Sequence, residues 1–111
     1  MNISFDQSKR RFIQEYGDVK FEKLCQKVKD SNALVKLTGL TVNKGLPPIA
    51  TDFLLSANSI FYVASKFDMA VSVMAALIML NIWNEKVNSL YQLISVQHLN
   101  VVTQQIAARW I

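Results

Sequence analysis

The charged residues of this 111-residue chain are concentrated at one end, and this asymmetry limits what the chain can fold into. Residues 1–44 hold nine of the twelve Lys and Arg and five of the eight Asp and Glu, so they account for the whole net charge of +4. Residues 45–111 hold only three charges of each sign. Because an ordinary soluble surface is roughly a quarter to a third charged residues, we expect most of the second part to be buried.

Turn-forming residues are rare, which favours helices over strands joined by tight turns. The chain has three Gly and two Pro, and 51% of its residues are hydrophobic, so it is neither a disordered nor a collagen-like chain. We predict an all-α fold, a small bundle of about five helices that forms a single domain over residues 1–111. A charged N-terminal half (1–44) would be joined to an apolar C-terminal half (49–111) by a connection containing Pro47 and Pro48.

Two helices are expected before residue 31. Ser4 and Gln7 have the spacing of a capping box, and Gly17 can end the first helix. Asp18 is expected to cap the second helix. Apolar residues of this second helix repeat at the spacing of a helix that faces a core: Phe21, Leu24, Cys25 and Val28.

The remaining helices are expected within residues 31–39, over 51–65, over about 69–95, and from residues 98–100 onward. The helix over about 69–95 is the longest. Its positions 69, 73, 76, 80, 83, 87, 90 and 94 are all apolar, and their alternating spacing of four and three is that of a heptad seam. No Gly or Pro interrupts the chain after residue 48.

Nothing in the sequence has the pattern of a catalytic or metal-binding site. One cysteine and one histidine exclude disulfide frameworks and metal sites that need several of either residue. The carboxylates form no pair, and the chain has neither a glycine-rich phosphate loop nor a nucleophile elbow. We therefore expect no enzyme activity, cofactor, metal or small-molecule substrate. Cys25 is interpreted as a reduced structural cysteine, and His98 as a surface or helix-capping residue.

The low charge of residues 45–111 predicts association with another protein chain. A domain of this size cannot bury two-thirds of its own chain completely, so a second copy or another protein would cover the remaining apolar surface. We expect a helical assembly or adaptor protein that acts by apolar helix–helix association with itself or with a partner protein. The expected partner-binding residues all lie on the long helix: Leu80, Trp83, Val87, Leu90, Tyr91 and Ile94.

Two other functions are compatible with the sequence. Six basic residues of the N-terminal helices could bind the phosphates of a nucleic acid, although acidic residues are interspersed among them: Lys9, Arg10, Arg11, Lys20, Lys23 and Lys27. Residues 53–83 could form a hydrophobic hairpin in a membrane, but a helix over the charge-free run 69–84 is about 24 Å long, against a hydrocarbon core of about 30 Å. The first residues lack the pattern of a signal peptide, so we expect a cytoplasmic, intracellular protein.

Overall fold

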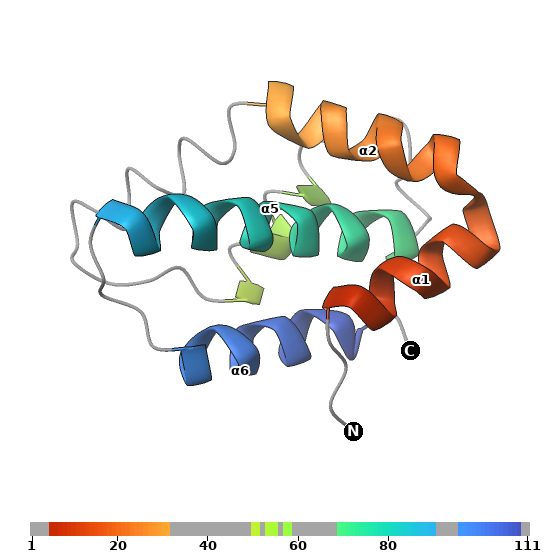
Figure 1. Ribbon diagram of the computed structural model, residues 1–111. Coiled ribbons are helices and arrows are strands. Elements are labelled where there is room, and N and C mark those ends of the chain that lie inside the picture. The colour runs from red at the N-terminus through yellow and green to blue at the C-terminus, as the bar shows by residue number, and fades with distance from the viewer. Residues whose placement is uncertain are drawn as a thin grey trace.

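The computed structural model describes residues 5–31, 50–51, 53–55, 57–58, 69–90 and 96–109, and these residues form an all-helical fold (Figure 1). The helices are α1 (Phe5–Tyr16), α2 (Asp18–Asp30), α5 (Met69–Leu90) and α6 (Val96–Ala107), and the described residues between 50 and 58 are also helical. No strand occurs within these ranges. The all-α prediction is therefore confirmed. The helix expected within 31–39 and the connection at Pro47 and Pro48 lie outside the described residues.

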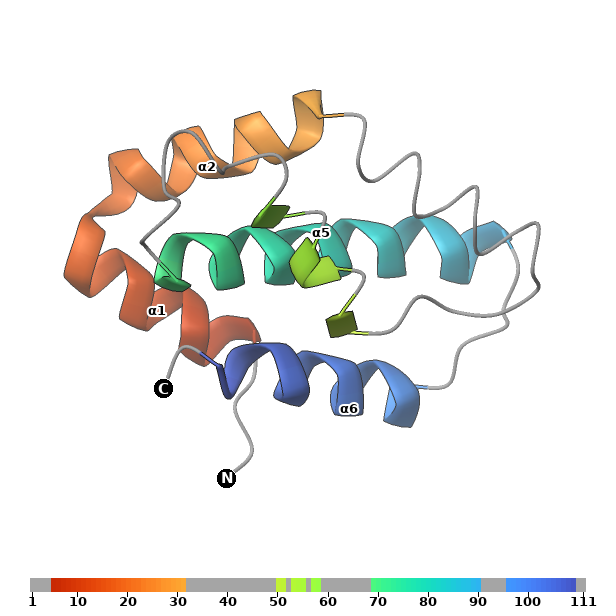
Figure 2. The same cartoon turned by 180° about the vertical axis from the view of Figure 1, so that it is seen from behind.

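Helix α5 lies between α2 and α6, and α1 crosses near the N-terminal end of α5 (Figures 1 and 2). Both α1 and α5 pack against each of the other three helices, whereas α2 and α6 lie on opposite sides of α5. The apolar sides of α1, α2 and α6 face the core around α5. Phe12 on α1 and Val28 on α2 are fully buried, and Ile106 on α6 is equally buried.

Helix α5 is buried on all sides along most of its described length. Every residue from 70 to 80 is buried, and Trp83 is also in the core. A helix that is apolar all round belongs inside a fold, because no side of it gains from water. The heptad positions 73, 76, 80 and 83 are buried as expected, and so is every residue between 73 and 80, while position 69 and Asn81 are exposed. The helix is thus enclosed by several neighbours rather than paired along one seam. Residues 91–95 lie outside the description.

The corner between α1 and α2 is built on Gly17. This glycine has φ 92° and ψ 159°, a backbone conformation that L side chains rarely adopt. Its N–H donates to the Ile13 carbonyl at 2.8 Å, and its own carbonyl accepts from the Phe21 N–H at 3.3 Å. The predicted cap at Asp18 is wrong by one residue, because Gly17 is the N-cap and Asp18 is the first helical residue. At this position the Asp18 carboxylate still stabilises the helix by interacting with the positive end of its dipole.

The structure also defines the end of α2 and the start of α6. Ser31 is the C-cap of α2, where its hydroxyl donates to the Val28 carbonyl at 2.7 Å. Helix α6 begins at Val96, ahead of the expected start at residues 98–100. Neither Val96 nor Gln97 is a helix breaker, so the helix begins two residues before the expected start.

Candidate interaction surface

The predicted partner-binding residues fall into two groups. Leu80 and Trp83 are buried by the chain's own helices, and the Trp83 ring packs edge-on against Phe53 with 5.9 Å between ring centroids. A partner could reach these two only by displacing part of the core. Val87 and Leu90 belong to α5, but their side chains lie outside the description, as do the whole of Tyr91 and Ile94. The structure thus brings two of the six together, inside the core.

Helix α6 presents an uncharged surface that was not singled out from the sequence. None of its twelve residues is charged. Its inner side is buried through Val102, Ile106 and Ala107. The opposite side, called the α6 face here, consists of four residues at the spacing i, i+3, i+4 and i+7: Val101, Gln104, Gln105 and Ala108.

The α6 face is open to solvent. Val101 is 47% exposed, which makes it one of the few large apolar side chains at the described surface. Gln105 and Ala108 are exposed, and Gln104 is half-buried. The Ala108 N–H donates to the Gln104 carbonyl at 3.0 Å, so the helical arrangement of the face continues through Ala108. The signal available in the sequence was the absence of charge from Val87 to Ala108.

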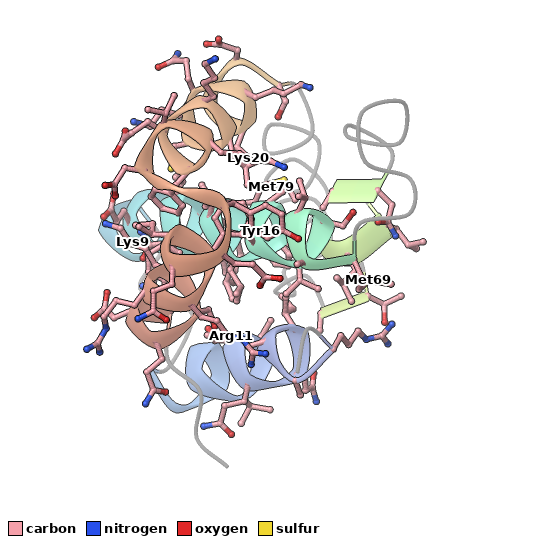
Figure 3. The ribbon with its side chains drawn as sticks, turned by 90° about the vertical axis from the view of Figure 1, so that its right-hand side faces the viewer. Lys9, Arg11, Tyr16, Lys20, Met69 and Met79 are labelled. Atoms are coloured by element: carbon pink, nitrogen blue, oxygen red, sulfur yellow. The ribbon has the colours of Figure 1, made fainter. Side chains whose placement is uncertain are left out.

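The predicted nucleic-acid residues are spread over α1 and α2. Lys9 is half-buried on α1, and the five others are exposed. Lys20, Lys23 and Lys27 share one flank of α2, because they lie at i, i+3 and i+7. Figure 3 shows Lys9 and Lys20 on opposite sides of the corner between the two helices. Lys9 and Lys20 therefore do not face the same site.

Two of these lysines pack over aromatic rings. The Lys20 ammonium lies 4.4 Å from the centroid of Tyr16, and the Lys9 ammonium lies 5.1 Å from that of Phe21. Phe12 joins both rings, stacked on Tyr16 at 4.6 Å and edge-on to Phe21 at 6.2 Å. Such cation–π contacts contribute about 0.5–1 kcal/mol each near a surface. The cluster therefore stabilises the corner at Gly17.

Cys25 is a free, half-buried cysteine on the core side of α2. Burial raises the pKa of its thiol, and the nearby Glu22 carboxylate raises the pKa further, while Lys29 and Lys9 oppose both effects. A thiol with a raised pKa is a poor nucleophile at neutral pH. This agrees with a structural cysteine. Across the described part of the chain, His, Cys, Asp and Glu form no group that could hold a metal ion.

Two buried polar atoms within the described ranges have no hydrogen-bond partner. They are the Ser8 hydroxyl oxygen on α1 and the Trp83 indole nitrogen on α5. An unsatisfied polar group in a core costs about 1–3 kcal/mol. Both atoms therefore weaken the fold.

Comparison with known proteins places the chain in no family. No protein family, curated protein or solved structure matches it. Among the described helices, none is both long and apolar enough to cross a membrane.

Proposed function

We propose that this chain is a non-enzymatic helical assembly or adaptor protein that acts by helix–helix association with a second copy or another protein. The observation that carries the proposal is the α6 face: a solvent-exposed helix surface with no charge and with an exposed valine at its N-terminal end. The cores of protein–protein interfaces are depleted of charged residues, whereas an outer helix without a partner is usually charged on its water-facing side.

The size of the face indicates a weak or transient contact. A helix of twelve residues is about 18 Å long. Paired with one similar helix, it buries less than the roughly 800 Å² per partner of a standard stable interface. We therefore expect association with a dissociation constant above about 1 µM, unless side chains from neighbouring elements add to the contact.

Nucleic-acid binding is a second candidate function, favoured by the basic flank of α2. Lys20, Lys23 and Lys27 repel one another at this spacing, which costs a few tenths of a kcal/mol and would be offset by an anionic ligand. The other flank of the same helix carries Asp18 and Glu22, whose carboxylates would repel phosphates. This opposition makes nucleic-acid binding the weaker candidate.

The experiment that separates the two candidates is light scattering with a mass readout, together with titration of fluorescent oligonucleotides, each at low and high salt. Apolar association persists or strengthens as salt rises, whereas phosphate binding weakens steeply. We expect a mass above the 12.6 kDa of one chain that increases with protein concentration at both salt levels. A mass of one chain at every concentration, without a co-purifying protein and with oligonucleotide binding at low salt only, would favour the second candidate instead.

A further inference from the structure

We infer that the occupant of the α6 face is the same face of a second copy, with the two α6 helices antiparallel about a two-fold axis. The inference rests on the proposed function and names its partner. Three properties of the described residues carry it: the distribution of charge, the hydrogen-bonding capacity of the glutamines, and the order of residues along the face.

Electrostatics favours α6 as the place where two identical copies meet. Each chain carries a net charge of +4, and its basic residues lie mainly on α1 and α2 in the described part. A symmetric contact through either of those helices would bring lysines of one copy near the same lysines of the other. Helix α6 has no charged residue, so two copies approach there with the least repulsion.

The polar residues of the face can pair with copies of themselves. In a two-fold contact the same surface patch lies on both sides, so it must complement itself. A glutamine amide both donates and accepts hydrogen bonds, whereas an ammonium group only donates and a carboxylate only accepts. Gln104 and Gln105 therefore meet the requirement of a symmetric contact.

The order of residues on the face favours the antiparallel arrangement. The spacing of Val101, Gln104, Gln105 and Ala108 reads the same in both directions. Reversing one helix about the midpoint places Val101 opposite Ala108 of the partner, and Gln104 opposite Gln105. Each apolar residue then meets an apolar residue, the larger against the smaller, and each amide meets an amide. Antiparallel helices also have opposed dipoles. The two copies of Arg109 then lie at opposite ends of the contact, far from each other.

The first test uses charge on the full-length chain. One double variant carries Val101→Lys with Gln105→Lys, and a second carries Val101→Glu with Gln105→Glu. The matched control is Val19→Lys, at a valine that is 69% exposed on α2. Because all three positions face solvent, melting temperatures should stay close to that of the original chain. We expect each double variant to associate about tenfold or more weakly, the control to associate normally, and an equimolar mixture of the two double variants to recover association as a heterodimer.

The outcomes distinguish this inference from the proposed function. If the double variants associate as well as the original chain, the α6 face is not the contact, but the proposed function stands. If the original chain remains a monomer at the highest concentration, self-association fails for every face, and the inference fails with it. Recovery in the mixture supports the inference directly, because only opposite charges in contact across two copies produce it.

The second test fixes the orientation by disulfide formation in a Cys25→Ser background. In the antiparallel arrangement, a chain with Val101→Cys should cross-link to a chain with Ala108→Cys. Neither chain alone should cross-link efficiently to its own kind, because residue 101 does not lie opposite residue 101. Efficient cross-linking of each single variant with itself would overturn the antiparallel arrangement.

Discussion

The corner at Gly17 makes a sharp prediction, because the strain of a substitution there depends on the handedness of the new residue. Gly17→Ala places an L side chain at φ 92° and ψ 159°, which costs about 1–3 kcal/mol. A Cβ at this position meets no atom within 4 Å, so the whole effect comes from the backbone. The reduced entropy of the unfolded chain recovers about 0.4–1 kcal/mol. We expect a net loss of about 1–2 kcal/mol in the free energy of unfolding and a melting temperature lower by roughly 5–15 °C.

D-alanine at the same position is the matched control. Its preferred backbone angles are the mirror image of those of L-alanine, so it adopts the corner without the strain. We therefore expect the D-alanine chain to be as stable as the glycine chain or slightly more stable. It can be made by ligating a synthetic peptide of residues 1–24 to residues 25–111 at Cys25, and compared by urea and thermal unfolding. Equal loss of stability in the L- and D-alanine chains would refute the reasoning.

Further predictions concern the core, its cysteine and the first two helices. Ser8→Ala should raise the free energy of unfolding by about 0.5–1 kcal/mol, because it removes an unsatisfied hydroxyl and adds a better helix former; a loss in urea unfolding would contradict this. Trp83→Ala should lower that free energy by about 3–5 kcal/mol, and Trp83→Phe by clearly less, because the indole N–H has no partner to lose; equal losses would show that the N–H matters. Cys25 should be alkylated slowly in the folded chain, and its alkylation rate should rise at a higher pH than in urea. Since the folded chain binds the thiol proton more tightly than the unfolded chain, the free energy of unfolding should fall as pH rises through the raised pKa. Cys25→Ala should remove this pH dependence. An unchanged pH dependence in that variant would assign it to other groups. Residues 1–44 alone should give the circular dichroism of an unfolded chain, because α1 and α2 lose α5; a cooperative melt would show a separate domain.

The helices and their inward faces could be predicted from periodicity, because burial follows the 3.6-residue repeat. Phe21, Leu24 and Val28 are buried as their spacing indicated, and Val102 and Ile106 of the last helix behave in the same way. The cap of α2 was misplaced for a physical reason. Capping rules look for a side-chain acceptor such as that of Asp18, whereas this corner uses the backbone freedom of a glycine.

What covers an apolar helix could not be predicted. A sequence such as that of α5 shows that the helix needs neighbours on several sides, but it does not show whether they belong to the same chain. The sequence predicts that Leu80 and Trp83 bind a partner, and in the structure both are buried on α5, which packs against α1, α2 and α6. The α6 face could not be predicted either, because a valine and an alanine beside two glutamines are typical of an ordinary surface until their exposure is known.

The enclosure of α5 has a consequence for synthesis of the chain on the ribosome. Helices α1 and α2 are translated first, but the helix against which they bury Phe12 and Val28 is complete only about sixty residues later. At roughly 5–20 residues per second, this leaves an interval of several seconds. During it the nascent chain exposes the apolar sides of both helices, and then those of α5 until α6 emerges. The order of the helices along the chain thus leaves apolar helix sides uncovered during synthesis until the helices that bury them are complete.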